Sequence, residues 1–236
     1  MIRLSKRLSM NASFVTPGNR LADVGTDHGY IPIALVQEKI IPSALAMDVN
    51  PGPLERAKQH IRESHLESDI HTRLSDGVQS LQPGEADSVL IAGMGGALTV
   101  KILQEGREVL RTVKELILQP QSEIDKVRRY LEQAGYKITK EDMVWEEGKY
   151  YQVMKAEAGE MHYDCENFYH YGKLLLESGH PVLRKYLTQR RALCEQLLKK
   201  LDQEGRIEER TQARLQEIKE EIQRIDTALR AYYDEM

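Results

Sequence analysis

The chain has 236 residues, a length that suits one large domain or one domain with a substantial appendage. Hydrophobic residues make up 41% of the chain, which is enough to bury a core and excludes a wholly disordered protein. Its 33 basic and 37 acidic side chains give a formal net charge of -4. A nucleic-acid partner would therefore have to be recognised by a local basic patch and not by bulk charge.

The sequence has no feature of an exported, membrane-bound or metal-rich protein. It has no uninterrupted apolar run of about 18 residues, and no apolar segment follows the basic N-terminus, as a secretory signal requires. Its two cysteines, Cys165 and Cys194, form no CxxC motif and no paired spacing. We therefore expect a cytoplasmic protein with no disulfide framework and no metal site.

Residues 20–157 alternate short β-rich runs with segments of helical spacing, such as Leu54, Ala57 and Ile61. This alternation predicts βαβ units and an α/β fold, in which a mostly parallel sheet is covered by helices on both faces. Two longer stretches joined through Gly148 predict an antiparallel hairpin at one edge. The expected strands are 21–24, 44–47, 70–74, 88–92, 116–118, 137–145 and 150–156, and expected helices include 31–38 and 123–134.

From about residue 160 the β-rich runs stop. Residues 166–176 predict one helix, which Gly179 and Pro181 end. Two long stretches on either side of Gly205 then repeat apolar residues every three or four positions, which is typical of an antiparallel, coiled-coil-like helical hairpin. The two stripes are Leu183, Leu187, Cys194, Leu197 and Leu201, and then Leu215, Ile218, Ile222, Ile225, Leu229 and Tyr232.

The most informative segment is residues 21–30, where an apolar run leads into the pattern Asp23-x-Gly25-x-Asp27-x-Gly29. Glycines at a strand-to-helix turn let the backbone approach a ligand closely, and the following helix N-terminus adds unpaired N–H groups. The pattern differs from the GxGxxG motif of nicotinamide sites, because Asp27 would repel the two phosphates. A cofactor with an ammonium group and no phosphate fits better, and S-adenosylmethionine is such a cofactor.

Three more motifs follow apolar strands. Asp48 ends the second strand, where a carboxylate accepts hydrogen bonds from ribose hydroxyls. Asp76 and Gly77 follow the third strand and are placed to meet an adenine amino group, and Gly93-Met94-Gly95 follows the fourth. Each motif alone is typical of a helix cap or a turn. Together, at the carboxyl ends of parallel strands, they predict one cofactor site.

These motifs resemble those of the bacterial family of tRNA (adenine-N1)-methyltransferases that modify adenine 22 of tRNA. The resemblance implies a Rossmann-like class I methyltransferase domain over residues 1–158, which binds S-adenosyl-L-methionine, and a helical hairpin domain over residues 159–236. It covers essentially the whole chain and implies a tRNA substrate. The matching stretches are Leu4–Leu8, Ala22–Pro32, Asp48–Pro53, Ser75–Gly77, Ala92–Gly96 and Leu116–Pro120.

Methylation by S-adenosylmethionine is an in-line displacement, for which an enzyme supplies mainly position and electrostatics. A pyrimidine C5 reaction would need a cysteine nucleophile near the cofactor, whereas both cysteines lie in the tail. Enzymes that methylate exocyclic amines commonly carry an Asn/Asp-Pro-Pro-Tyr/Phe segment, and this chain has Gly93–Gly96 instead. A ring atom is therefore the more natural target, and adenine N1 needs no deprotonation before attack.

Asp27 is the best candidate for stabilising the cationic product, with His28 as the second catalytic candidate and Gln119 as a hydrogen-bond partner for a base edge. The alternatives are a turn carboxylate that holds loop amides, a structural histidine and a loop residue before Pro120. The cofactor-binding candidates are Asp23, Gly25, Asp27, His28, Gly29, Tyr30, Asp48, Val49, Asn50, Asp76, Gly77, Ala92, Gly93, Met94 and Gly95.

Adenine N1 is on the Watson–Crick edge, so the target base must be unpaired or flipped into a site at the carboxyl ends of the strands. Arg3, Lys6 and Arg7 have the spacing of one helical face and are the candidate RNA-binding residues; a solvated helix face is the alternative. Weaker candidates for RNA contact are Tyr150, Tyr151, Tyr163, Tyr169, Tyr171, Lys199, Lys200 and Arg206.

Two other classes of function remain open at this stage. One is a non-catalytic scaffold that acts through its coiled coil, although a scaffold need not keep the acidic cofactor motifs. The other is a small-molecule methyltransferase that uses the helical tail as a lid or dimer interface. A monomer is favoured over an oligomer.

Overall fold

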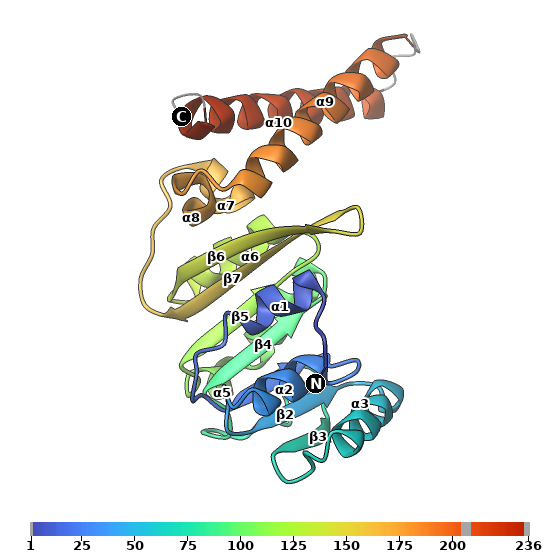
Figure 1. Ribbon diagram of the computed structural model, residues 1–236. Helices are drawn as coiled ribbons and strands as arrows, with labels where there is room; N and C mark the ends of the chain where they lie inside the picture. Colours follow the sequence, from blue (N-terminus) through green and yellow to red (C-terminus); the bar gives the residue numbers. More distant parts are fainter. Residues whose placement is uncertain (1, 204–208, 234–236) are drawn as a thin grey trace. The chain divides into compact units, whose positions relative to one another are not determined.

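The computed structural model describes residues 2–203 and 209–233 (Figure 1). The chain divides into two compact units, Met1–Asp164 and Cys165–Met236. Every candidate residue for the cofactor site lies in the first unit, and the predicted helical hairpin lies in the second.

The first unit contains a seven-stranded sheet in the order β3-β2-β1-β4-β5-β7-β6. The first five strands run parallel to their neighbours, whereas β7 is antiparallel to both β5 and β6. The strand order reverses between β1 and β4, and such a reversal is where open α/β sheets bind ligands. The strands are β1 (Leu21–Val24), β2 (Ala44–Asp48), β3 (Ile70–Leu74), β4 (Ser88–Ala92), β5 (Glu115–Gln119), β6 (Tyr136–Glu146) and β7 (Lys149–Ala158).

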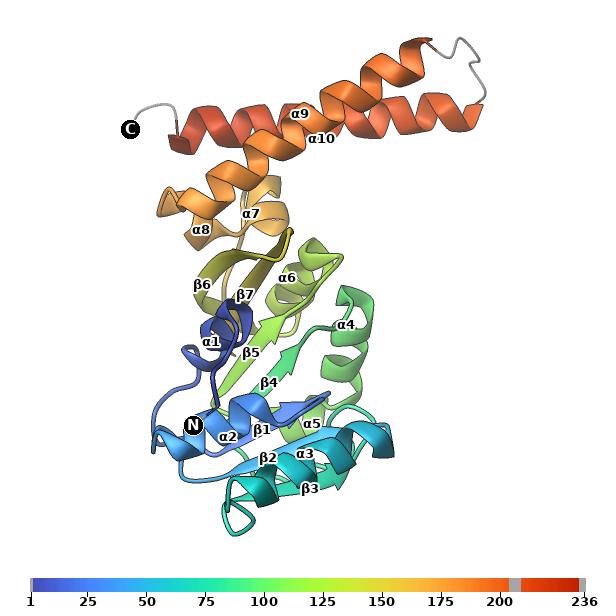
Figure 2. The same cartoon turned by 45° about the vertical axis from the view of Figure 1, so that its right-hand side comes forward.

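Helices cover both faces of this sheet, as Figure 2 shows. Side chains of α1 (Lys6–Ala12), α2 (Tyr30–Gln37) and α3 (Pro51–Glu63) share one buried cluster. Side chains of α4 (Gly96–Glu105), α5 (Arg107–Leu110) and α6 (Ile124–Gln133) share the other. Neighbouring residues of β4 belong to opposite clusters, Leu90 to the first and both Val89 and Ile91 to the second. A strand buried on both faces reads as a continuous apolar run, and this confirms the predicted α/β architecture.

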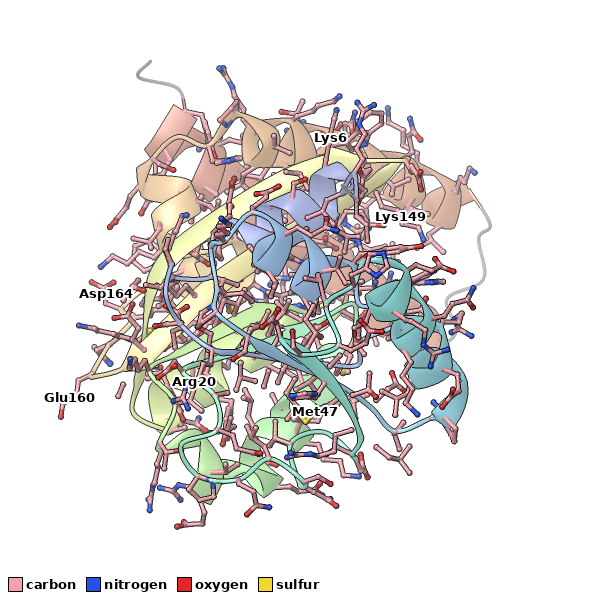
Figure 3. All side chains as sticks on the ribbon, turned by 60° about the horizontal axis from the view of Figure 1, so that its bottom comes forward. Lys6, Arg20, Met47, Lys149, Glu160 and Asp164 are labelled. Carbon is pink, nitrogen blue, oxygen red and sulfur yellow. The ribbon has the colours of Figure 1, made fainter. Side chains whose placement is uncertain are left out.

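The first helix is fastened to the β6–β7 hairpin. Its N-cap is Ser5, whose hydroxyl accepts a hydrogen bond from the Leu8 N–H, and the Glu146 carboxylate of β6 accepts bonds from the N–H groups of Lys6 (2.6 Å) and Arg7 (3.3 Å). Figure 3 marks Lys6 and Lys149, the residue paired with Glu146 across the hairpin. Because α1 begins at Lys6, Arg3 lies outside the helix, and the prediction of one helical face for all three basic residues is wrong.

The second unit begins with two short helices, α7 (Glu166–Tyr171) and α8 (Lys173–Glu177), where the sequence predicts one. Gly172 between them has φ +92 and ψ 122, a conformation that no α-helix contains and that residues with a Cβ rarely adopt. The prediction of a continuous helix over residues 166–176 is therefore wrong. Tyr169 and Tyr171 are buried, so they are not free to stack on bases.

The predicted hairpin is formed by α9 (Pro181–Gln203) and α10 (Glu209–Tyr233). Two ion pairs join the helices, Arg190 with Glu221 and Arg191 with Asp226. Arg190 lies on the first stripe between Leu187 and Cys194, and its charge is matched there by an acid of α10. The buried residues of α10 match the predicted stripe only in part. Leu229 and Tyr232 are half-buried, and the adjacent Ala228 and Tyr233 are buried instead. The buried residues are Leu183, Leu187, Cys194, Ile218, Ile225, Ala228 and Tyr233.

The basic residues that the sequence offered for RNA contact in the tail lie near the turn between α9 and α10. Lys199 and Lys200 are exposed near the end of α9, and Arg206 lies outside the described residues. No helix within residues 2–203 and 209–233 is both long and apolar enough to cross a membrane.

Candidate active site

The turn from β1 to α2 forms the centre of the candidate site. Met47, which is labelled in Figure 3, lies at the end of β2. Its backbone carbonyl oxygen accepts hydrogen bonds from the N–H groups of Gly25 (2.8 Å) and Thr26 (2.9 Å), and these bonds hold the turn against β2. Gly25 has φ +76, and a Cβ added there would overlap the side chain of Met94. The turn therefore requires glycine for its backbone conformation, and the flexible end of the Met94 side chain packs into the space beside it.

Asp23 is a buried carboxylate at this turn, with 8% of its surface exposed. Burial, with a smaller contribution from the negative charge of Asp48, raises its pKa to about 6. A carboxylate that is poorly solvated and faces a second acid favours the approach of a cation. This is the environment that a cofactor with an ammonium group requires.

Asp27 is exposed and already has partners. It is ion-paired with the guanidinium of Arg56 on α3, and its other carboxylate oxygen lies 3.2 Å from Nε2 of His28. The His28 ring stacks on Tyr30 (4.9 Å between centroids) and on His60 (5.3 Å). The turn, the start of α2 and α3 thus form one aromatic and charged cluster. Arg56 and His60 were not among the predicted site residues, because their only signal in the sequence is a four-residue spacing on a helix.

A cavity of about 240 Å³ opens at this cluster. It brings together many of the predicted residues and adds Leu8, Thr26 and Ile31, which the sequence analysis did not single out. Arg7 lines it from α1, whereas Arg3 lines a different cavity with residues of α2. The predicted residues that line the site cavity are Arg7, Asp23, Gly25, Asp27, His28, Gly29, Tyr30 and Ala92.

Asp48 and Asp76 lie along the same edge of the sheet but outside this cavity. Asp48 accepts a hydrogen bond from the Asn50 N–H through Oδ1 (2.7 Å), and its carbonyl oxygen accepts one from the Ser75 N–H (2.9 Å). The end of β2 and the start of the loop after β3 are thereby joined. Val49 and Asp76 are exposed beside them, so both acids are accessible to the nucleoside part of a ligand.

The loop after β4 is fixed by the loop after β5. The Gly93 N–H donates to the carbonyl oxygen of Gln119 (3.0 Å), and the Gln121 N–H donates to that of Met94 (2.8 Å). Gly95 is the N-cap of α4. This part of the predicted cofactor site is therefore held next to the end of β5, where Gln119 lies.

Gln119 is fully buried, and its side chain is directed at Arg7. Its Oε1 accepts a hydrogen bond from Nη1 of Arg7 (3.2 Å), while its Nε2 has no hydrogen-bond partner among the described residues. Gln119 does not line the cavity. The structure thus places Gln119 behind Arg7, and not where the predicted contact with a base edge would put it.

Among residues 2–203 and 209–233, no cluster of three His, Cys, Asp or Glu side chains is arranged to hold a metal ion. The residues gathered at the site are typical of a binding site for a small organic ligand with polar and charged groups.

Three comparisons place the chain among known proteins. Residues 4–154 match the family model of a methyltransferase domain. The tRNA (adenine(22)-N(1))-methyltransferase of Bacillus subtilis (strain 168) is 39% identical over 159 residues, which are 67% of this chain and 67% of that protein.

Solved structures extend the similarity to the whole fold. The B. subtilis m1A22 tRNA methyltransferase TrmK is 30% identical, with a TM-score of 0.86 over 97% of this chain and 100% of that one. A candidate tRNA (m1A22) methyltransferase of Streptococcus pneumoniae, solved in complex with S-adenosyl-L-methionine, is 33% identical, with a TM-score of 0.86 over 96% of this chain and 100% of that one. The chain belongs to the bacterial family of tRNA (adenine-N1)-methyltransferases that act on adenine 22 of tRNA.

Proposed function

We propose that this protein transfers the methyl group of S-adenosyl-L-methionine to N1 of adenine 22 in tRNA. The observation that supports it most is the cavity that joins the buried Asp23 carboxylate to the β1–α2 turn, in a chain of this family. A nicotinamide cofactor would bring a pyrophosphate to a turn that carries two carboxylates, Asp23 and Asp27, and would be repelled.

The residues at the strand ends fit the chemical groups of the cofactor. Asp23 would hold the ammonium group, because its carboxylate is buried and poorly solvated. Asp48 uses Oδ1 for its bond from the Asn50 N–H, so its other carboxylate oxygen would accept hydrogen bonds from the ribose hydroxyls. Asp76, exposed on the next loop, would accept from the adenine amino group. Bound there, the cofactor supplies an electrophilic methyl group on a sulfonium.

Adenine N1 attacks this methyl group with its in-plane lone pair, and the electrons of the broken carbon–sulfur bond return to sulfur. No proton has to be removed from N1 first, so the site needs no general base. The adenine ring gains the positive charge that the sulfonium loses. The protein contributes orientation and a negative potential on the side of the base.

Asp27 would supply part of this potential. It lines the cavity, it is exposed and its carboxylate is held in a fixed orientation by Arg56. The pairing also reduces its effective charge, because the Arg56 guanidinium lies against one of its oxygens. His28 and Tyr30, stacked on each other beside Asp27, provide flat surfaces against which a base can pack.

The target base has to leave its helix or stack to reach this cavity, because N1 lies on the Watson–Crick edge. The cavity of about 240 Å³ lies at the carboxyl ends of the strands and is open to solvent, so an extruded base can enter it. We also propose that the two compact units, Met1–Asp164 and Cys165–Met236, act as the catalytic part and a substrate-orienting part; the sequence predicts this boundary after residue 158.

Mass spectrometry of nucleosides tests this function directly. Unmodified tRNA is incubated with the protein and S-adenosylmethionine that carries a labelled methyl group, then digested to nucleosides. We expect labelled 1-methyladenosine, and none from the same tRNA with guanine in place of adenine 22. Label in another nucleoside, or at another adenine, contradicts the assignment of the target. Absence of labelling together with absence of cofactor binding favours a non-catalytic scaffold.

A further inference from the structure

Arg7 and Asp23 carry opposite charges on one cavity. Arg7 comes from α1 and Asp23 from β1, and both line the cavity that also contains the β1–α2 turn. The remaining charged groups of that lining are Asp27, which is paired with Arg56, and His28 when it is protonated. Arg7 is therefore the permanent cation of this cavity.

The guanidinium of Arg7 is held in place by side chains from distant strands. Gln119, at the end of β5, accepts a hydrogen bond from Nη1, and the guanidinium carbon lies 5.3 Å from the ring centroid of Tyr151 on β7. Arginine has only donors, so the Gln119 atom that faces it must be the amide oxygen. Gly93 lies against the guanidinium, since a Cβ built on it would be in ordinary van der Waals contact with Nη1 at 3.5 Å.

The backbone of Arg7 is fixed as well. Glu146 accepts hydrogen bonds from the N–H groups of Lys6 and Arg7, and this holds the start of α1 against the β6–β7 hairpin. A solvated arginine on an exposed helix face, the alternative left open by the sequence, has no such fixed partners. Fixing both the backbone and the guanidinium is instead typical of a residue that binds one ligand group in a defined geometry.

We propose that Arg7 binds the carboxylate of the cofactor's methionine moiety, so that Arg7 and Asp23 together clamp its zwitterionic end. A planar guanidinium matches a carboxylate with two parallel hydrogen bonds, and Arg7 retains four N–H donors after its bond to Gln119. Gln119 is then a positioning residue that acts through Arg7. This inference rests on the proposed cofactor.

The alternative oxyanion is the phosphate of the target nucleotide, which the basic cluster of the sequence analysis was expected to bind. The lining of the cavity favours the carboxylate. Arg7 shares its cavity with the buried acid that fits the ammonium group, and it does not share it with Arg3 or Lys6.

Binding measurements with two ligands test this inference without relying on activity. The ligands are S-adenosylmethionine and its decarboxylated analogue, which keeps the sulfonium and the ammonium group but lacks the carboxylate. The variants are Arg7→Met, Arg7→Lys and Gln119→Met, with Lys6→Met as the matched control, because Lys6 is the neighbouring cation on α1 and does not line the cavity. Thermal unfolding without ligand reports whether each variant is folded.

We expect Arg7→Met to weaken S-adenosylmethionine roughly 10- to 100-fold, the usual range for a lost hydrogen bond to a charged group, and to leave the decarboxylated analogue nearly unchanged. Arg7→Lys should restore part of the affinity, because a lysine keeps the charge but not the paired geometry. Gln119→Met should cause a smaller loss with the same selectivity. Lys6→Met should affect neither ligand.

An equal loss for both ligands in a folded Arg7→Met protein would overturn the inference and leave Arg7 as a structural residue. Unchanged affinity for both ligands, with weaker tRNA binding and a flatter salt dependence, would overturn it in favour of a phosphate contact. Failure of the unaltered protein to bind S-adenosylmethionine would refute the proposed function instead. The two failures are therefore distinguishable.

Discussion

The carboxylate of Asp27 is ion-paired with the guanidinium of Arg56, although 29 positions separate the two residues in the sequence. This pair links the turn after β1 to α3. His60 of α3 also stacks on the rings of His28 and Tyr30 at the start of α2. The pair can act in catalysis, by fixing a carboxylate near the base, or in structure, by fastening α3. The two roles predict different results for the two partners.

We expect Asp27→Ala to slow methyl transfer by about tenfold or more while cofactor affinity changes by less than about threefold, because the carboxylate acts on charge that develops in the transition state. Single-turnover rates and equilibrium binding on the same preparation measure the two quantities. The matched variant is Arg56→Met, which removes the orienting partner of Asp27 but also the charge that offsets it, and should slow methyl transfer less than Asp27→Ala does. A loss as large in Arg56→Met as in Asp27→Ala would show that the pair only anchors α3.

The affinity for S-adenosylmethionine should rise with pH between about 5 and 7. Burial raises the pKa of Asp23 to about 6 in the free protein, and a bound ammonium group favours the ionised form, so binding releases a proton when the pH is below this value. The dissociation constant should therefore fall by up to about tenfold per pH unit below pH 6 and become constant above it. The amino group of the ligand stays protonated in this range, since its pKa is near 8.

Two controls isolate the contribution of Asp23. Methylthioadenosine lacks the amino-acid end of the cofactor, so its affinity should not vary over the same pH range. Asp23→Asn should bind S-adenosylmethionine weakly and without this pH dependence. Identical pH profiles for the two ligands would mean that Asp23 does not face the ammonium group.

Asp48→Ala should weaken cofactor binding by about 1–3 kcal/mol, because the ribose hydroxyls would lose their acceptor and remain unpaired. The fold should persist, since Asp48 is a half-buried strand end whose side chain accepts a hydrogen bond from the nearby Asn50 N–H. Calorimetry with S-adenosylmethionine measures the change, and Asp69→Ala, in the exposed loop before β3, provides a carboxylate control outside the site. Unchanged affinity in a folded Asp48→Ala protein would exclude the ribose contact.

A fully buried ion pair, Arg128 on α6 with Glu141 on β6, joins the helix to the edge hairpin at 2.7 Å. Removing one partner leaves the other as a buried charge, so Arg128→Met should lower the free energy of unfolding by about 3–5 kcal/mol. The double variant with Glu141→Met should recover much of this loss, because no charge then remains buried. Urea unfolding of the three proteins gives both values, and equal stabilities of the single and double variants would show that packing, not charge, causes the loss.

The sequence predicted the sheet well because its signals are local. A buried parallel strand is a short apolar run, and each of β1, β2 and β4 is such a run followed by a turn motif. The turn at Gly25 could also be predicted, because the backbone conformation that requires glycine there depends on only a few neighbouring residues. The break at Gly172 was missed because the flanking residues keep helical spacing, and only the backbone of that glycine departs from the helix.

The contacts that organise the site could not be predicted because they join distant segments. Arg7 and Gln119 are 112 positions apart, and Arg7 and Glu146 are 139 apart. The spacing of Arg3, Lys6 and Arg7 does not indicate that Arg7 alone lines the cavity. Arg7 differs from the other two because Ser5 and Glu146 together determine where α1 begins.

The last prediction concerns the two compact units. The Met1–Asp164 unit has its own sheet, both of its buried clusters and every proposed cofactor residue. Residues after β7 still belong to it, because Tyr163 is buried and its N–H donates to Glu132 of α6 at 2.9 Å. We expect a chain that ends after Asp164 to stay folded and bind S-adenosylmethionine with the affinity of the full chain, and a chain that ends after Ala158 to be less stable, because it lacks the contact of Tyr163.

Methylation of tRNA by the chain that ends after Asp164 should be far slower than by the full chain, since a helical hairpin that orients a long substrate contributes to the rate through positioning. The measurements are cofactor affinity, thermal unfolding and the rate of 1-methyladenosine formation for all three chains. Full turnover after removal of residues 165–236 would make the hairpin an element of stability or assembly. Loss of cofactor binding in that chain would show that the two units fold as one and that the tail supports the site itself.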